Sequence, residues 1–171
     1  MPVEEQLLTN SYDALYDSGG AQRAGQCLII ANRVVTKVGF WLKKEGDPIG
    51  DITYFIRKMD DTILLSKSLG DASTLTLLDV YYELTFLVPA LINEQVRMTL
   101  DFYGGDVDNN VRAQRNTDVK AGEFRCYAIG VAWSQDASRD FTYRYTYEEP
   151  PAGLGDKSAN MGNKMVGAGL I

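Results

Sequence analysis

Hydrophobic and polar residues alternate with a period of two along most of residues 27–147, a pattern typical of β-strands with one buried face. In the segment 94–103, for example, Val96, Met98, Leu100 and Phe102 alternate with more polar residues. The segments that share this pattern are 27–31, 33–42, 51–58, 62–68, 79–88, 94–103, 111–115, 123–133 and 140–147. None shows the longer period of an amphipathic helix, so the sequence predicts an all-β chain.

Turn-forming residues separate the predicted strands. They gather at 43–50 (KKEGDPIG) and at 104–110 (GGDVDNN). Pro89 is expected to end the strand at 79–88, because proline has no amide hydrogen to donate to a strand ladder. Many short strands with one solvated face favour an antiparallel β-sandwich, and jelly-roll topology is the expected connectivity.

The first 26 residues differ from the β-sandwich domain, which we place at 27–147. They contain the break Ser18-Gly19-Gly20 and a further glycine at position 25. We interpret this segment as an extended N-terminal arm, with one short helical turn at Glu4–Thr9 that ends in a loop.

Residues 148–171 form a Gly-rich C-terminal tail. The tail holds five of the 16 glycines, and Pro150-Pro151 marks its beginning. Its far end is apolar and rich in small residues, which suits a segment that lies in a groove or along a strand edge of a neighbouring subunit. The residues expected to make this assembly contact are Met161, Met165, Val166, Leu170 and Ile171.

Composition argues against several classes of function. The chain of 171 residues contains no histidine, which removes Ser–His–Asp and Cys–His catalysis and every histidine metal site. A net charge of −6 disfavours nucleic acid as a partner, since phosphate binding needs a basic face. No apolar run approaches the roughly 18 residues of a membrane span. The N-terminus also lacks the features of a secretory signal.

The two cysteines, Cys27 and Cys126, lie far apart in the sequence and form no CxxC motif. This spacing does not fit a zinc site. We expect two free, buried thiols, because a single bridge is not a disulfide framework. A disulfide between them is the alternative, and the sequence does not show whether they meet.

The order of several short motifs between Gly25 and Tyr145 resembles a known module. The matching pieces are Gly25-Gln26-Cys27-Leu28, Val34–Leu42, Gly46–Asp51, Tyr82–Phe86, Tyr103–Asp106 and Trp133 followed by Asp140-Phe141. This order is similar to that of a small jelly-roll β-sandwich found in phage and other virion proteins, and also appended to bacterial surface proteins and glycan-degrading enzymes. Cys27-Leu28 depart from the Ser-Phe pair of that family. The resemblance implies the fold, and implies either structural assembly or glycan binding.

The loop 104–110 is a candidate calcium site. Asp106, Asp108 and Asn110 stand at alternate positions, and calcium prefers oxygen ligands of this kind. An EF-hand is excluded, because Val111 stands where that loop requires glycine and Thr117 where it requires glutamate. A looser calcium site between loops stays open beside the alternative of a solvated turn.

Aromatic side chains are the candidates for glycan binding, because a sugar ring packs against an exposed aromatic face. The residues selected for this role are Trp41, Tyr81, Tyr127 and Trp133. The alternative is that they are ordinary strand residues that pack in the core, where tyrosine and tryptophan are common.

Charged residues in the predicted strands give little support for an enzyme. Glu83, Asp101 and Glu123 would have to face one cleft to act as a glycosidase acid and base. Glu83 and Asp101 fall on the polar phase of their strands, which favours solvated surface. The scattered arginines are expected in surface salt bridges, and they are Arg97, Arg112, Arg115, Arg125, Arg139 and Arg144.

These observations lead to an expected function. The chain is expected to be a non-enzymatic structural protein that assembles with copies of itself or with other virion proteins, as a capsid, decoration, spike or tail-associated component. Its terminal arms would contact neighbouring subunits. The alternative is a glycan-binding β-sandwich module used in host or surface recognition. We expect a virion location after synthesis in the host cytoplasm, with no nucleic-acid partner, no membrane insertion and no cofactor beyond the calcium considered above.

Overall fold

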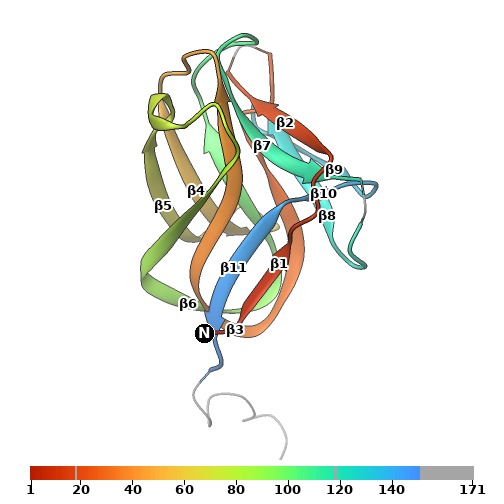
Figure 1. The fold of residues 1–171 in the computed structure, drawn as a ribbon. Helices are drawn as coiled ribbons and strands as arrows, with labels where there is room; N and C mark the ends of the chain where they lie inside the picture. The colour runs from red at the N-terminus through yellow and green to blue at the C-terminus, as the bar shows by residue number, and fades with distance from the viewer. Residues whose placement is uncertain (18, 118, 151–171) are drawn as a thin grey trace, which may run out of the picture.

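The computed structural model describes residues 1–17, 19–117 and 119–150 (Figure 1). Its strands form one antiparallel sheet, which confirms the prediction of an all-β chain. They are β1 (Val3–Gln6), β2 (Ser11–Leu15), β3 (Arg23–Glu45), β4 (Asp51–Lys58), β5 (Ile63–Asp71), β6 (Val80–Phe102), β7 (Asn110–Asn116), β8 (Phe124–Ile129), β9 (Ala132–Asp136), β10 (Asp140–Phe141) and β11 (Tyr143–Glu148). A 3-10 turn, η1 (Ala72–Thr74), is the only helical element in these three ranges, where no helix has the length and apolarity to cross a membrane.

Two strands of 23 residues, β3 and β6, form the centre of the sheet and pair with each other. Each of them joins two segments that the sequence pattern separated. Strand β3 includes both 27–31 and 33–42, and β6 includes 94–102 together with most of 79–88. The prediction that Pro89 ends a strand is therefore wrong.

Each strand bends at a local irregularity in its pairing and then continues in the extended conformation. Asn32 adopts a positive φ of 53°, next to a register shift between Ile30 and Arg33. A second shift leaves residues 86–89 of β6 without a partner in β3. Pro89 lies in this unpaired stretch, so its missing amide hydrogen removes no ladder hydrogen bond.

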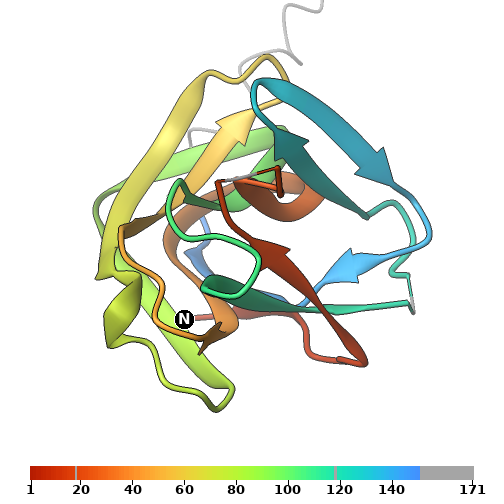
Figure 2. The same ribbon diagram turned by 90° about the horizontal axis from the view of Figure 1, so that it is seen from above.

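The sheet folds over on itself to enclose a hydrophobic core. Its main path runs β1-β11-β3-β6-β4-β5, while β7 and β8 pair with the two ends of β3. Viewed from above, the strands surround a common interior (Figure 2). The largest fully buried side chains there are aromatic: Tyr54, Tyr143, Tyr145, Phe40, Phe102 and Phe141. Phe40 meets Tyr54 and Phe141 edge to face, at centroid distances of 5.0 and 5.8 Å.

The N-terminal segment completes the protein's own sheet. Strand β1 pairs with β11, and β2 pairs with β7 (Figure 1). The helical turn expected at Glu4–Thr9 is wrong, because Val3–Gln6 are extended. Burial opposes ionisation of Glu4, but hydrogen bonds from Lys120 and Arg33 hold its pKa below the ordinary value of 4.5. These partners lie far away in the sequence, so the local composition of β1 gives no sign of them.

Cys27 and Cys126 meet between the adjacent strands β3 and β8. Both thiols are free and fully buried. The strand register places Cys126 opposite Gly25 and Cys27 opposite Phe124, so the two cysteines are diagonal neighbours. Burial and the contact with Cys27 raise the pKa of the Cys126 thiol. A protonated, buried thiol is a poor nucleophile.

We therefore expect neither thiol of the native protein to react with a disulfide reagent such as Ellman's reagent on a time scale of minutes. Both should react at once in guanidinium chloride, because unfolding exposes them. A Ser134→Cys variant is the positive control, since Ser134 is exposed on β9 and should add one fast-reacting thiol. Rapid labelling of two thiols in the folded wild-type protein would contradict the burial described here.

Candidate functional site

One side of the sheet has an open edge between β5 and the first half of β6. Strand β4 pairs with β5 on one side and with residues 96–102 of β6 on the other. Within the described pairings, residues 80–85 of β6 pair only with β3, residues 86–88 have no partner in β3, and β5 pairs only with β4. The two free edges face each other, since Lys67 Nζ of β5 donates a hydrogen bond to the Thr85 carbonyl oxygen of β6 at 2.7 Å.

A groove of about 320 Å³ lies between these two free edges. It is lined by Leu64, Leu65, Ser66, Lys67, Phe86, Leu87 and Val88. Most of the lining is aliphatic or aromatic, and Lys67 supplies the only charge. We call this feature the β5–β6 groove.

Leu87 and Val88 protrude at the rim of the β5–β6 groove and are 92% and 78% exposed. They belong to residues 86–89, the stretch that has no partner in β3. Phe86 and Val88 have the same phase in the predicted strand 79–88, but the structure places them differently. The alternation ends at the irregularity after Thr85, so Phe86 is buried while Val88 is in solvent. The sequence does contain one signal, because apolar Leu87 stands on the phase otherwise held by polar residues such as Glu83 and Thr85.

A second surface carries two of the four aromatic candidates. Trp41 of β3 and Tyr81 of β6 are direct neighbours in the register, and their rings lie 4.4 Å apart at an angle of 39°. Both are half-buried. The guanidinium of Arg144 lies 5.7 Å from the Trp41 ring and 5.1 Å from the Tyr81 ring. Gly39 leaves the space that Tyr81 occupies, because a Cβ there would lie 2.5 Å from the phenol ring.

Polar groups at the edge of this aromatic pair are already oriented. The Tyr81 hydroxyl donates to Glu83 Oε2 at 3.0 Å, and Lys37 donates to the other carboxylate oxygen at 2.9 Å. Burial and the nearby Glu83 carboxylate raise the pKa of Tyr81, so the phenol stays protonated at neutral pH. We call Trp41, Tyr81 and their polar neighbours the aromatic face.

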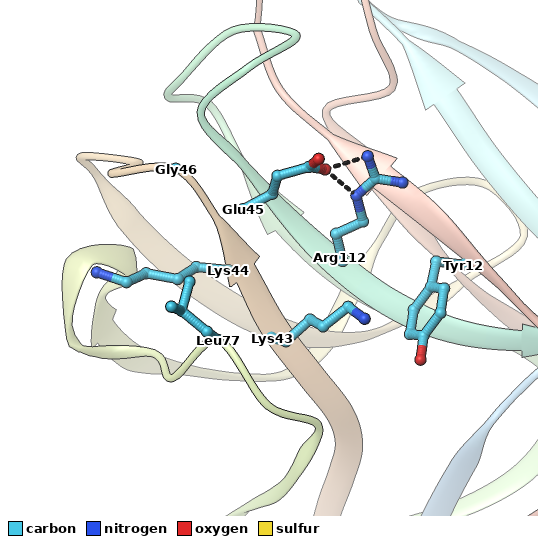
Figure 3. Close-up of a pocket in the computed structure, with 7 residues that line it drawn as sticks. All are labelled: Tyr12, Lys43, Lys44, Glu45, Gly46, Leu77 and Arg112. Carbon is cyan, nitrogen blue, oxygen red and sulfur yellow. Dashed lines mark hydrogen bonds and ion pairs between the residues drawn. The ribbon is translucent and has the colours of Figure 1, made fainter.

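A pocket of about 400 Å³ opens beside the aromatic face (Figure 3). Lys43 lines this pocket and lies two residues after Trp41, so both point to the same side of β3, about 7 Å apart. Lys43 Nζ lies 3.9 Å from the centre of the Tyr12 ring, and the Tyr12 hydroxyl donates to Asp79 at 2.6 Å. Arg112 of β7 stands opposite Lys43 in the strand register and forms an ion pair with Glu45 (Figure 3).

The pocket is one that sequence reasoning missed. Its lining residues are Tyr12, Lys43, Lys44, Glu45, Gly46, Leu77 and Arg112. Tyr12 and Arg112 come together only because β2 pairs with β7, where Ala14 stands opposite Arg112. Lys43 and Arg112 each form an ion pair with a carboxylate. The pocket therefore presents hydrogen-bond donors and acceptors side by side, next to aromatic rings.

The other two aromatic candidates, Trp133 and Tyr127, lie on the β8–β9 hairpin and are engaged within the protein. Trp133 Nε1 donates to both carboxylate oxygens of Asp61 at 2.8 and 2.9 Å. Its indole ring lies 4.7 Å from the Arg97 guanidinium. The Arg125 guanidinium covers Tyr127 at 4.1 Å. The structure therefore brings Trp41 and Tyr81 together but places Trp133 and Tyr127 elsewhere.

The charged groups under Trp133 are buried, contrary to the expectation of a solvated surface for Asp101 and Arg97. Asp101 is 4% exposed and Arg97 is 7% exposed. Arg57 donates to Asp101 at 3.0 Å. Burial raises the pKa of Asp101, and the positive charges of Arg57 and Arg23 oppose this shift. The alternation pattern correctly placed Asp101 and Arg97 on the side of the strand that faces away from the hydrophobic core. Trp133 of the β8–β9 hairpin lies over this side, however, and the charged groups there are buried.

The three carboxylates considered for acid–base chemistry are each held by separate partners. Glu83 contacts Lys37 and Tyr81, and Asp101 contacts Arg57. Glu123 forms an ion pair with Lys120 at 2.9 Å and accepts a hydrogen bond from the Tyr143 hydroxyl at 2.7 Å. They occupy different parts of the sheet and share no groove among those described here.

The candidate calcium loop is organised by its own hydrogen bonds. Asp106 Oδ1 accepts hydrogen bonds from the backbone amides of Asp108 and Asn109, both at 2.9 Å, and these lower the pKa of Asp106. Asn110 Nδ2 donates to the Val107 carbonyl oxygen at 2.8 Å, while its Oδ1 is buried without a partner. In the described ranges, no three histidine, cysteine, aspartate or glutamate residues cluster as metal ligands. Calcium binding at Asp106, Asp108 and Asn110 stays a prediction.

The predicted assembly residues of the tail, Met161 to Ile171, lie outside the described residues. Comparison of the chain with protein-family models and with curated proteins gives no match. Two surfaces of the described residues are therefore candidates for a function: the β5–β6 groove with its protruding Leu87 and Val88, and the aromatic face with its pocket.

Proposed function

We propose that this protein is a non-enzymatic structural subunit that joins a larger assembly through its open β5–β6 edge. The observation that carries the proposal is the pair Leu87 and Val88, which protrude into solvent beside two free strand edges. An exposed aliphatic pair next to unpaired backbone groups is a template for contact with another chain. Proteins that stay monomeric usually protect such an edge with charge or proline, whereas Leu87 and Val88 at this rim are apolar and exposed.

We further propose that the sheet acts as a rigid jelly-roll sandwich, with copies of the same chain or other virion proteins as neighbours. The enclosed core and the two long bent strands support the rigid unit. The virion location rests on the motif order between Gly25 and Tyr145 that resembles phage and other virion modules.

The replacement Leu87→Glu tests this assembly function. We expect the full chain to form a defined oligomer at micromolar concentration, and the variant to raise its dissociation constant at least about tenfold, because a carboxylate would have to be desolvated at the interface. Light scattering over a concentration series measures both masses. Val131→Glu is the matched control, since Val131 is 88% exposed on the β8–β9 turn and does not line the β5–β6 groove. A wild-type chain that stays monomeric throughout the series would refute the proposal.

The aromatic face supports a second candidate function, glycan binding. Trp41 and Tyr81 form one continuous aromatic surface, and the adjacent pocket presents Lys43 and Arg112 together with their carboxylate partners. Sugar rings stack on such surfaces through their C–H groups, while their hydroxyls need donors and acceptors side by side. Assembly and glycan binding are compatible, because they use different surfaces.

The replacement Trp41→Ala tests glycan binding. On an array of neutral and acidic oligosaccharides, we expect the wild-type protein to bind a defined set, and the variant to lose about tenfold or more in affinity, because the stacking surface is removed. Trp133→Phe is the control, since Trp133 lies on the other hairpin and contacts Asp61. Absence of any binding by the wild-type protein, or equal losses in both variants, would remove this candidate.

A further inference from the structure

We propose that the β5–β6 groove receives residues Met165–Ile171 from the tail of a neighbouring copy of this chain. The proposal deepens the assembly function above and rests on it, since it names the segment that covers the open edge. The sequence of this segment is MVGAGLI, with two pairs of large apolar residues on either side of Gly167, Ala168 and Gly169.

The chemistry of the groove fits this occupant. Its walls are mainly aliphatic and aromatic, from Leu64 and Leu65 of β5 and from Phe86, Leu87 and Val88 of β6. Large side chains at both ends of the segment would contact these walls. Small residues at its centre would let its backbone approach the free strand edges, in the way that a peptide adds to an exposed sheet edge.

The length of the segment also fits. Seven extended residues span about 23 Å, which is shorter than the nine-residue strand β5. A strand of this length is long enough to pair along the free edge and bury Leu87 and Val88 under its side chains. The groove and the tail segment carry few charges, Lys67 being the only one in the lining. Burying the segment there would therefore desolvate little charge.

The tail leaves the sheet near the β5–β6 groove. Glu148, the last residue of β11, stands opposite Val34, and Val34 stands opposite Leu91 of β6. The tail therefore starts about 10 Å, or two strand spacings, from Leu91, which is three residues beyond Val88. Figure 1 shows β11 ending at the same end of the molecule as the bends of β3 and β6.

A two-fold axis near this end would allow two copies to exchange tails reciprocally. Residues 149–164 span up to about 50 Å when extended, enough to cross to a neighbour. Each copy would then donate one segment and receive one, so the contact closes into a dimer rather than continuing into a fibre. We assign the groove to the partner's tail and not to the chain's own, because the assembly function proposed above requires a contact between copies.

A photo-crosslinking experiment on the full chain tests this inference. The photoreactive residue p-benzoylphenylalanine replaces Ser66, which is exposed and lines the groove. Chains with natural nitrogen and chains uniformly labelled with 15N are mixed, allowed to exchange and irradiated, and crosslinked peptides are identified by mass spectrometry. We expect crosslinks from position 66 to residues 165–171, with mixed light–heavy pairs showing that the two peptides come from different chains. The same photoreactive residue at Ser134, exposed on β9, should give no crosslinks to the tail.

A paired set of tail variants gives an independent measurement. The double replacement Val166→Glu with Leu170→Glu should raise the dissociation constant of the oligomer at least about tenfold, as Leu87→Glu does. The control Ser158→Glu with Asn160→Glu adds the same charge to the polar part of the tail and should leave the mass unchanged. All four positions lie outside the β-strands described above, and both pairs add the same charge, so the control accounts for a general effect of charge on folding.

The outcomes separate this inference from the proposed function. Crosslinks only within one chain, or only to another surface of the second copy, would overturn the inference. If Leu87→Glu then still dissociates the oligomer, the assembly function stands without the tail. A monomeric wild-type chain with no crosslinks between chains would overturn both.

Discussion

Replacing Gly25 with alanine is expected to destabilise the protein by about 3 kcal/mol or more, among the largest effects of any single methyl group in this sheet. Gly25 lies in β3 between two strands, opposite Thr99 of β6 and Cys126 of β8. A Cβ at this position would lie 2.0 Å from the Met98 carbonyl oxygen and 2.7 Å from the Thr99 Cα. Both are backbone atoms of a central strand, so neither moves without breaking the pairing of β3 with β6.

The control for this experiment is Gly39→Ala. A Cβ at Gly39 would meet the Tyr81 ring at 2.5 Å, which is also too close. The obstacle there is a half-exposed side chain that can rotate away, so we expect a loss of only about 1 kcal/mol. Urea unfolding followed by circular dichroism measures both values. Similar losses for the two variants would contradict the distinction between a backbone and a side-chain obstacle. Gly39→Ala also displaces Tyr81 of the aromatic face, so this variant should weaken any glycan binding.

The replacement Asp13→Asn is expected to cost about 3–5 kcal/mol of the free energy of unfolding. Asp13 of β2 is 7% exposed and forms ion pairs with two arginines, Arg115 at 2.9 Å and Arg125. The arginine side chains are only 15% and 10% exposed. Removing the carboxylate charge leaves two buried cations with less compensation, and Asp136 lies 3.7 Å from Arg125 as the nearest remaining anion.

An exposed pair provides the matched control for Asp13→Asn. Glu45 and Arg112 form an ion pair whose side chains are 48% and 33% exposed, so Glu45→Gln should cost no more than about 1 kcal/mol. Thermal and urea unfolding of both variants give the comparison. The result also decides the role of the N-terminal segment. A near-neutral effect of Asp13→Asn would mean that β2 is a loosely held arm, as the sequence alone led us to expect.

The strands were predictable because their signal is local. A strand that buries one face needs apolar residues at every second position, and segments such as 51–58 and 94–103 show this directly. The prediction failed where local structure interrupts the alternation. Pro89 indicated an end to the strand, but the unpaired stretch around it allows β6 to continue. Strand β1, with the sequence VEEQ, has no alternation at all and is held in place by pairing with β11 and by ion pairs.

The candidate surfaces were predictable only in part. Trp41 and Tyr81 were selected as aromatic candidates, and their direct contact follows from the register of β3 against β6. Trp133 was selected on the same grounds, yet Asp61 and Arg97 hold it within the protein. Residue type alone did not show which of these aromatic rings lie side by side.

The sequence by itself determined the all-β class, the alternating faces of the main strands and the absence of histidine chemistry. These depend on composition and on a two-residue period, and both are local properties of the chain. Only the tertiary structure decided that Leu87 and Val88 protrude, that Asp13 meets Arg125 and that Tyr12 shares a pocket with Arg112. Each of these depends on strand register and on irregularities between segments distant in the sequence. A shift of one residue in that register would move every outer side chain to the opposite face.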